Sequence, residues 1–311
     1  LSSSSAASDV YKRQVYGCLH EYNDIDSSML ISNNNLSVYH GNDNFITEKS
    51  LAPFKKKVGH VDVACVPFAY INYYPYLLNG ISKKINKAEA IRLESLFMDY
   101  GIMQSKILKP EIVIPFGSNL FHLDDPKCDM NKGVATPVDF VNYAKIKHKQ
   151  QSDKYKTMLS GSFCLKKNDK ISLYYEKISQ KRFDKELVKF TNKKKQLSKK
   201  VKTIKKVPIT KNKLEFIRNK IKLNSNKIDH NIVISKKSNS KEKIIINLKT
   251  NNVICRYQTT IPENCHYFIV QDNEFNLWLN NKITFEEVLG TGRFRYNRNP
   301  NIYRLKINQI K

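Results

Sequence analysis

Long apolar runs and paired cysteines are both missing from this sequence. No apolar run approaches the ~20 residues that a helix needs to span a bilayer, so the sequence predicts no membrane span. The six cysteines are widely scattered and form no C-x-x-C pair, which argues against a zinc ribbon or an iron–sulfur cluster. In a chain of 311 residues this spacing also does not suggest a disulfide framework. We therefore expect reduced, mostly structural thiols in a cytoplasmic protein.

Closely spaced histidines are missing as well. The chain has seven histidines, and no two of them are separated by a single residue. Structural and catalytic zinc centres take three or more ligands, and Rieske clusters use cysteine and histidine in pairs. The sequence therefore contains no local motif for a complete metal site.

Acidic residues are scarce: 28 Asp and Glu stand against 54 Lys and Arg, a formal net charge of +26. Such an excess normally indicates nucleic-acid binding, because Lys and Arg displace counterions from phosphates. Half of it lies in residues 181–220, where sixteen basic and three acidic residues give a net charge of +13. The chain is also crowded with Asn and Ile, which share A/T-rich codons with Lys. A genome poor in G and C would produce this bias without a polyanionic partner, so nucleic acid stays an open but less favoured partner.

The basic segment has helical periodicity. Its apolar residues recur at steps of three, four and seven, with Lys194 interrupting the series: Phe183, Leu187, Phe190, Leu197, Val201 and Ile204. This pattern predicts an amphipathic helix that packs on its own protein through Phe183, Leu187, Phe190, Leu197 and Val201. Pro208 ends it, and a second helical run follows over 213–223. The alternative is a surface that binds nucleic acid or anionic lipid. No RNA- or DNA-recognition motif in the sequence supports this alternative.

The most informative positive signal lies between residues 61 and 143. Two short apolar runs closed by proline, Val63–Pro67 and Ile112–Pro115, flank a run with amphipathic helical spacing. Two shorter runs upstream, Met29–Ser32 and Leu36–His40, also look like strands. Buried strands with a helix between them make a βαβ unit, so the sequence predicts an α/β fold. Ligands bind beyond the carboxyl ends of such strands.

The strings VDVACVPFA and KPEIVIPFGSNLFHLDD, with a helix leading to DYG between them, resemble the C-terminal half of metallo-β-lactamase-fold hydrolases. The most similar subgroup contains ascorbate-6-phosphate lactonase-like proteins and the metallo-β-lactamase domain of CMP-N-acetylneuraminate hydroxylase. The resemblance covers roughly residues 21–145 and implies part of an αβ/βα sandwich with zinc or iron as cofactor. It also implies that Asp43, in the HGNDN loop, is a metal ligand of the intact protein. Without the resemblance, Asp43 could simply cap a turn.

The chain departs from this family in two places. The first metal motif of the family, H-x-H-x-D-H, is absent, and its late histidine is replaced by Phe116 or Gly117. Residues 1–14, LSSSSAASDVYKRQ, resemble translated adapter sequence, although an ordinary disordered tail is the alternative. We therefore expect residues 15–145 to form a partial domain whose upstream half carries most ligands, and we expect the fragment to be inactive.

Four further residues are candidates for contacts with the metal ligands or the substrate: His40, Asn119, His122 and Tyr74. Each histidine has a plainer interpretation. His40 ends an apolar run and could be structural, and His122 could be an exposed loop residue. Tyr74 could line a sugar-like substrate, yet aromatic residues in a proline-containing loop more often pack.

Residues 242–311 are expected to form a small α+β unit, after a lysine-rich helical segment over 146–241. The expected strands are Ile244–Leu248, Val253–Gln258 and Tyr267–Gln271. Thr284 and Glu287 form a capping-box pattern. This unit resembles the C-terminal portion of the same hydroxylase-like subgroup and, more distantly, the small α/β module of sterol-carrier-type proteins. Its arginines, Arg293, Arg295 and Arg298, could hold a phosphate or a carboxylate or form the exposed side of a strand.

Two functional classes remain. The first is a metal-dependent enzyme acting on a sugar acid, a lactone or a nucleotide-sugar, either as a hydrolase or as a hydroxylase supplied with electrons by a Rieske cluster. The second is a non-catalytic basic protein that binds nucleic acid or an anionic surface. An H-x-H-x-D-H motif in an upstream reading frame would favour the enzyme.

Overall fold

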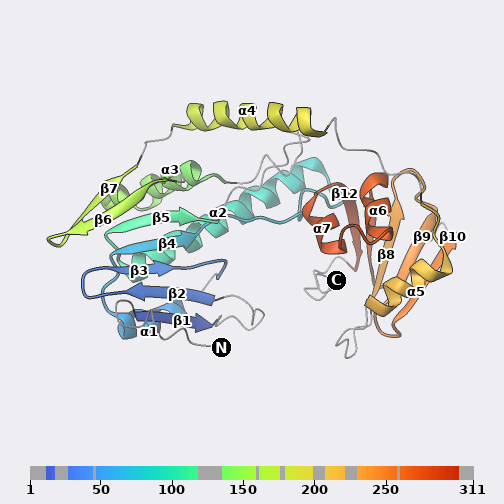
Figure 1. The fold of residues 1–311 in the computed structure, drawn as a ribbon, viewed down its shortest axis with the longest axis horizontal. Coiled ribbons are helices and arrows are strands. Elements are labelled where there is room, and N and C mark those ends of the chain that lie inside the picture. The colour runs from blue at the N-terminus through green and yellow to red at the C-terminus, as the bar shows by residue number, and fades with distance from the viewer. Residues whose placement is uncertain are drawn as a thin grey trace. The chain divides into compact units, whose positions relative to one another are not determined.

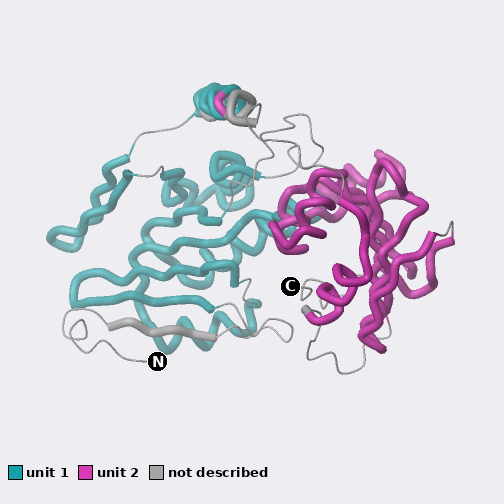
Figure 2. The backbone as a smooth tube through the Cα atoms, turned by 45° about the vertical axis from the view of Figure 1, so that its right-hand side comes forward, with its two compact units in different colours: residues 1–71, 91–121, 133–192 teal, residues 72–90, 122–132, 193–311 magenta. Residues whose placement is uncertain are grey.

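The chain divides into two compact units (Figure 2). Unit 1 comprises residues 1–71, 91–121 and 133–192, and unit 2 comprises residues 72–90, 122–132 and 193–311. The computed structural model describes residues 12–17, 27–44, 47–117, 135–158, 161–175, 179–198, 207–220, 230–257 and 260–300. Each unit contains a five-stranded sheet with helices, which confirms the α/β class. None of the helices in these ranges is long and apolar enough to cross a lipid bilayer.

The sheet of unit 1 has the strand order β1-β2-β3-β4-β5 (Figure 1). Its strands are β1 (Lys12–Gly17), β2 (Ser27–Ser32), β3 (Ser37–His40), β4 (Val63–Pro67) and β5 (Ile112–Phe116). The first three are antiparallel, whereas β3, β4 and β5 are parallel. Helices α1 (Glu48–Val58) and α2 (Lys83–Leu108) connect the parallel strands. The predicted strand–helix–strand unit is therefore confirmed.

Strand β1 begins inside the stretch that the sequence suggested setting aside. Lys12, Arg13 and Gln14 pair with Ser32, Ile31 and Leu30 of β2, so these three residues continue the strand that follows them. Strand pairing depends on the backbone of the partner strand as well as on side-chain pattern, which is why the hydrophobic pattern gave no signal here.

One face of this sheet is covered by helices. Tyr39, Ala64 and Val113 are fully buried in a single core cluster with Leu51 of α1 and Phe140 of α3 (Pro137–Lys147). Helix α3 begins with a capping box, in which the side chains of Thr136 and Asp139 satisfy each other's backbone N–H groups. Its capped start fixes where Phe140 enters the core.

A hairpin lies within the segment that the sequence assigned to helix. Strands β6 (Phe163–Lys167) and β7 (Lys170–Tyr174) pair antiparallel, and they follow the short 3₁₀ helix η3 (Lys149–Lys154). The two turn residues, Asn168 and Asp169, both have positive φ, which suits a tight hairpin turn. The stacked rings of Phe163 and Tyr174 lie 4.7 Å apart across the pair.

The basic segment contains two helices, α4 (Gln180–Ser198) and α5 (Lys211–Lys220), as expected. The predicted packing of α4 is wrong at Phe190, whose side chain is 59% exposed, while Leu187 is half-buried. The apolar stripe is narrow and interrupted by lysine, so it offers little area to bury. The side chains of Phe183 and Leu197, and all of Val201, lie outside the described residues.

The sheet of unit 2 has the order β10-β9-β8-β11-β12. Its strands are β8 (Asn231–Lys236), β9 (Glu242–Asn247), β10 (Asn252–Tyr257), β11 (Cys265–Val270) and β12 (Phe294–Asn299). Strands β8 and β11 are parallel, and the other neighbours are antiparallel. The three strands predicted for 242–271 are confirmed, whereas β8 was not expected.

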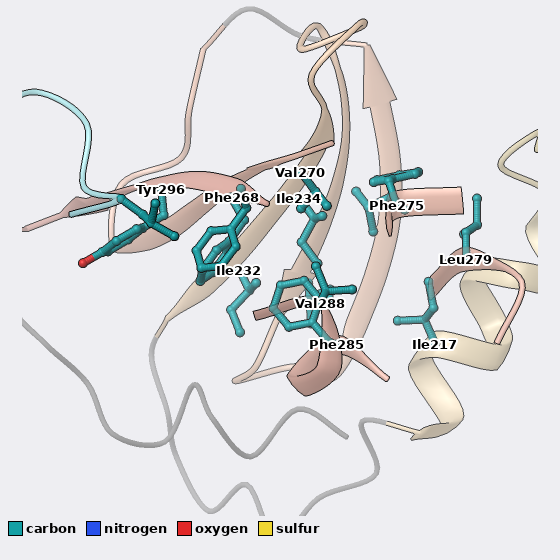
Figure 3. Close-up of a cluster of buried hydrophobic side chains, with 14 of the residues drawn as sticks. Ile217, Ile232, Ile234, Phe268, Val270, Phe275, Leu279, Phe285, Val288 and Tyr296 are labelled. Atoms are coloured by element: carbon teal, nitrogen blue, oxygen red, sulfur yellow. The ribbon is translucent and has the colours of Figure 1, made fainter. Parts of the chain in front are cut away.

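Helices α6 (Asp272–Leu279) and α7 (Phe285–Gly290) help to enclose the core of unit 2. Figure 3 shows Phe268 of β11 close to Tyr296, with Phe285 and Val288 of α7 facing the sheet. The predicted capping box is present: Thr284 Oγ1 accepts a hydrogen bond from Glu287 N, and the Glu287 carboxylate accepts one from Thr284 N. The capped turn holds α7 over the sheet.

Candidate functional site

The loop after β3 passes so close to β4 that it leaves no room for a side chain at Gly41. Gly41 N donates a hydrogen bond to the carbonyl of Cys65 on β4 (2.8 Å), and Asn44 N donates to the carbonyl of Gly41 (3.1 Å). A Cβ at position 41 would lie only 2.7 Å from Pro67 Cδ, closer than real Cβ contacts. Asn42 has a φ of 49°, a conformation that asparagine tolerates better than most residues. This tight turn places Asp43 at an exposed tip.

A buried network of polar side chains holds the loop from below. The Ser28 hydroxyl donates to the carbonyl of Gly41 (3.3 Å) and accepts from the Tyr39 hydroxyl (3.1 Å) and from the Asn44 side-chain amide (3.2 Å). Burial raises the pKa of Tyr39 to about 12, so its hydroxyl remains a donor at neutral pH. All three side chains are fully buried. Because the network is satisfied, the position of Asp43 is well defined.

His40 supports this loop. Its Nδ1 accepts a hydrogen bond from Asn42 N (3.2 Å), so in the neutral ring the proton resides on Nε2. Burial lowers the pKa of His40 below its ordinary value of 6.5, although the charge of Asp43 acts in the opposite direction. The ring packs edge-on against Phe116, with 4.2 Å between centroids. His40 thus positions the loop, and its protonated Nε2 is not a metal ligand in this tautomer.

Asp43 faces the end of β5. Gly117, directly after β5, has a φ of 84°, and a Cβ built there would lie 3.6 Å from Asp43 Oδ1. Both residues lie beyond the carboxyl ends of the parallel strands, where ligands bind in α/β sheets. The structure therefore brings Asp43 and His40 together with Phe116 and Gly117, the two positions at which the resemblance places a missing histidine.

A complete zinc or iron site does not fit the described residues around Asp43. Such a site needs three or more protein ligands, and this loop supplies one carboxylate and a histidine whose Nδ1 is already hydrogen-bonded. The other predicted residues do not add to it. Asn119 and His122 lie outside the described residues, and Tyr74 belongs to unit 2. There the Tyr74 hydroxyl donates to Glu89 Oε1 (3.1 Å).

A different trio of potential ligands lies at the amino ends of β4 and β5. One atom each from His60, Asp62 and Glu111 can be chosen so that all three lie within 4.8 Å of one another. Lys166 Nζ, however, already lies 2.7 Å from Asp62 Oδ1, so the lysine ammonium balances the charge of this carboxylate where a metal ion would otherwise do so. His60 and Glu111 are exposed. We interpret the trio as part of an ion-pair network. Sequence reasoning missed it because Glu111 and Lys166 lie far along the chain from His60 and Asp62.

Comparisons with known proteins give little further guidance. No protein-family model and no curated protein matches the chain. Two solved structures from Aedes aegypti are similar to 32% of it: sterol carrier protein-2 like-3, at 11% identity over 92% of its length, and sterol carrier protein-2 like-2, at 14% identity over 94%. Their TM-scores are 0.25 and 0.24, too low to assign a fold. The sterol-carrier resemblance of residues 242–311 therefore stays a prediction.

Proposed function

We propose that residues 15–145 are part of a cytoplasmic, metal-dependent enzyme of the metallo-β-lactamase fold. Its substrate would be small and polar, such as a sugar acid, a lactone or a nucleotide-sugar, and the reaction would be hydrolysis or hydroxylation like that of CMP-N-acetylneuraminate hydroxylase. The observation that carries the proposal is the exposed Asp43, fixed by a buried network and facing Gly117 beyond the carboxyl ends of β3 and β5. This is the edge of the sheet at which α/β proteins bind ligands.

Within this proposal each residue near Asp43 has a distinct task. Asp43 contributes one carboxylate ligand, and His40 and Gly41 hold the loop that presents it. The remaining ligands would come from an upstream segment with the H-x-H-x-D-H motif. In the intact protein, zinc or iron would lower the pKa of bound water or activate oxygen. The described residues do not complete the site, so we assign them no step of the reaction.

The second face of the unit 1 sheet also supports a partial sandwich. The strand registers align Met29 with His40, Ile31 with Val38, and Cys65 with Ile114. These residues point away from the helix-covered face and are only half-buried, whereas Val63 and Ile112, which share that face, are buried. In a sandwich a second sheet covers such an apolar face. An upstream half of the domain would supply that sheet.

Metal analysis tests the proposal. After dialysis, this chain is expected to retain substoichiometric zinc or iron, whereas a protein extended by its upstream reading frame retains a full complement and turns over substrate. In the extended protein, Asp43→Ala should lose metal, while Asp169→Asn, which removes a fully exposed carboxylate, should not. A fragment that keeps tightly bound metal would mean that the ligands lie elsewhere in this chain.

A second candidate, a basic binding protein, rests on α4. Lys181, Arg182, Lys185 and Lys189 are exposed along this helix, next to the exposed ring of Phe190. Exposed cations beside an aromatic ring are suited to single-stranded nucleic acid. We favour the first candidate, because a lysine-rich exposed helix is equally well explained by codon bias.

Salt dependence distinguishes the two candidates. We expect fluorescence anisotropy with labelled oligonucleotides to show weak binding, indifferent to sequence, that falls at least about tenfold between roughly 50 and 200 mM salt. Charge reversal at Lys189 should weaken this binding further, because it removes one cation from the exposed face. Tight, salt-resistant and sequence-selective binding would contradict this expectation and favour the basic binding protein.

A further inference from the structure

Unit 2 contains a pocket on the face of its sheet that lies opposite to Phe268 and the helices. Its volume is about 320 Å³, at the lower end of the range of small-molecule sites. Residues of three adjacent strands, β8, β9 and β10, line it together with residues 260–262 (Figure 1). The pocket has no part in the proposed enzyme site, because Asp43 belongs to unit 1.

The strand registers show that the lining side chains of these strands point to one face. Ile245 of β9 is paired with Ile254 of β10 and with Val233 of β8. Ile245 and Val233 belong to a buried cluster separate from the helix-covered core. Residues two apart on a strand share a face, so Asn247 and Asn252, which are also paired, lie on this face too. The pocket therefore has an isoleucine floor and an asparagine rim.

The backbone fixes the side-chain amides of two asparagines at this rim. Asn247 Oδ1 accepts hydrogen bonds from Lys249 N and Thr250 N, both 3.0 Å, so its Nδ2 is the atom left to bind a ligand, as a donor. Asn231 Nδ2 donates to the carbonyl of Glu263 (3.3 Å), which leaves its Oδ1 available as an acceptor. Rotation of either amide by half a turn would break these bonds, so the orientation of both is set.

The two fixed amides lie side by side. Asn231 and Asn247 are directly opposite in the register of β8 and β9, which places their Cβ atoms about 4.5–5.5 Å apart on the same face. A donor and an acceptor are therefore presented together, next to the apolar side chain of Ile245. A cis-amide, or lactam, has the complementary edge, because its C=O accepts from Asn247 Nδ2 while its N–H donates to Asn231 Oδ1.

The charge of the lining disfavours a cationic ligand. Arg256 lies on the same face as Ile254, two residues further along β10, and it also lines the pocket. Lys243 is directly opposite Arg256 in the register and places a second cation near this end of the pocket. The part of the lining that the structure describes contains no Asp or Glu. A neutral ligand therefore fits the pocket better than a cation.

We propose that this pocket binds a small, flat heterocycle with a lactam edge. The edge forms one hydrogen bond with Asn247 and one with Asn231, and a face of the ring contacts Ile245 and Ile254. The backbone holds both amides before the ligand arrives, so little side-chain entropy is lost on binding. The site is independent of Asp43 and of the proposed metal chemistry.

Ligand-observed NMR on the full chain tests the site with quinolin-2-one, a flat lactam. Two matched compounds lack its N–H: N-methylquinolin-2-one and 2-methoxyquinoline. Quinolin-2-one is expected to bind at least about tenfold more tightly than either, because both matched compounds leave the Asn231 acceptor without a donor. Equal binding of the three compounds, or no binding of quinolin-2-one, overturns the proposal.

A nearly isosteric variant, Asn247→Asp, tests the donor itself. The carboxylate still accepts from Lys249 N and Thr250 N, so the turn is kept, but the donor becomes an acceptor. Quinolin-2-one should lose its preference, and 2-aminoquinolinium, which offers two donors, should gain more affinity than N-methylquinolinium, a cation without donors. Asn35→Asp, the same change at an exposed position of unit 1, should alter none of these affinities.

A second variant separates the floor of the pocket from the amides. Ile254 is half-buried on the edge strand β10, so Ile254→Phe can narrow the pocket without changing Asn231 or Asn247, and it should weaken all three neutral quinolines. Fluorescence of Trp278 checks that each variant is folded. The proposal is overturned if Ile254→Phe leaves binding unchanged, or if Asn247→Asp keeps the preference for quinolin-2-one.

Discussion

Replacement of Phe268 by alanine is expected to destabilise unit 2 by about 3–5 kcal/mol, the usual cost of deleting a fully buried aromatic ring. The Phe268 side chain has no exposed surface. Its ring lies 5.3 Å from that of Phe285 in a T-shaped contact and 6.0 Å from that of Tyr296 in a stacked one. Because these neighbours come from a helix and from the adjacent strand, they cannot all move to fill the cavity.

The single tryptophan of the chain makes this measurement specific. Trp278 packs against Phe285 and Phe275, so its fluorescence reports on the core of unit 2. Denaturant titration followed at this residue should show the loss for Phe268→Ala. Tyr257→Ala is the control, because it removes an aromatic ring that is 72% exposed on the same sheet and should change stability by less than about 0.5 kcal/mol. A loss for Phe268→Ala no larger than that of the control would contradict the described core.

The strands and caps that the sequence predicted correctly share a local cause. Strands β4 and β5 are short apolar runs ended by proline or glycine, and most of their residues are buried in the structure. The cap at Thr284 and Glu287 needs only residues three apart. In each case the residues that decide the structure are neighbours in the chain, so the pattern alone was sufficient.

The elements that the sequence missed lie where lysine obscured the pattern. Strand β7 reads KISLY, an alternation that a background rich in lysine makes easy to overlook, although Asn168 and Asp169 do mark a hairpin turn. The apolar run of β8, NIVISK, falls in the same basic segment. At Phe190 the helix was predicted correctly but its burial was not. Periodicity shows which face is apolar, and only tertiary contacts decide whether that face is covered.

In the candidate sites, too, features within one segment could be predicted from the sequence, whereas contacts between distant segments could not. The loop from His40 to Asn44 could be singled out from the sequence, because its residues are contiguous. That Gly117 lies opposite Asp43 depends on the order of the parallel strands. The contact of Arg298 with Tyr74 depends on the folding of residues 72–90 into unit 2. No pattern within one segment predicts such long-range contacts.

The carboxylate of Asp62 links segments of unit 1 that lie far apart in the sequence. Its carboxylate accepts hydrogen bonds from Ser37 N (2.6 Å) and the Ser37 hydroxyl (3.0 Å), and it pairs with Lys166 of β6 (2.7 Å). The side chain is only 3% exposed. Burial alone would raise the pKa of Asp62, but hydrogen bonds from Lys166, Ser37 and His60 outweigh it and hold the pKa below its ordinary value of 3.8. The carboxylate thus joins β3, β4 and the β6–β7 hairpin.

Asp62→Ala is therefore expected to destabilise unit 1 by about 2–3 kcal/mol, because the partly buried Ser37 N–H loses its charged acceptor and Lys166 loses its buried partner. Hydrogen exchange of peptides covering β3 and β4 measures the loss. Asp169→Asn is the matched control, since Asp169 lies 4.0 Å from the same Lys166 Nζ but is fully exposed, and it should change exchange little. Equal effects of the two substitutions would show that burial of Asp62 does not matter.

The loss in Asp62→Ala should also depend on pH, with a sign fixed by the lowered pKa. A carboxyl group with a lower pKa in the folded state contributes its full stability above its unfolded value, near 3.8, and loses it as the pH falls through the folded pKa. The difference between the unmodified protein and Asp62→Ala should therefore be largest at about pH 6 and shrink below about pH 4. Exchange rates corrected for intrinsic pH effects give both values. A gap that stays constant, or widens in acid, would mean that the Asp62 charge does not stabilise the junction and that packing alone holds the hairpin to the sheet.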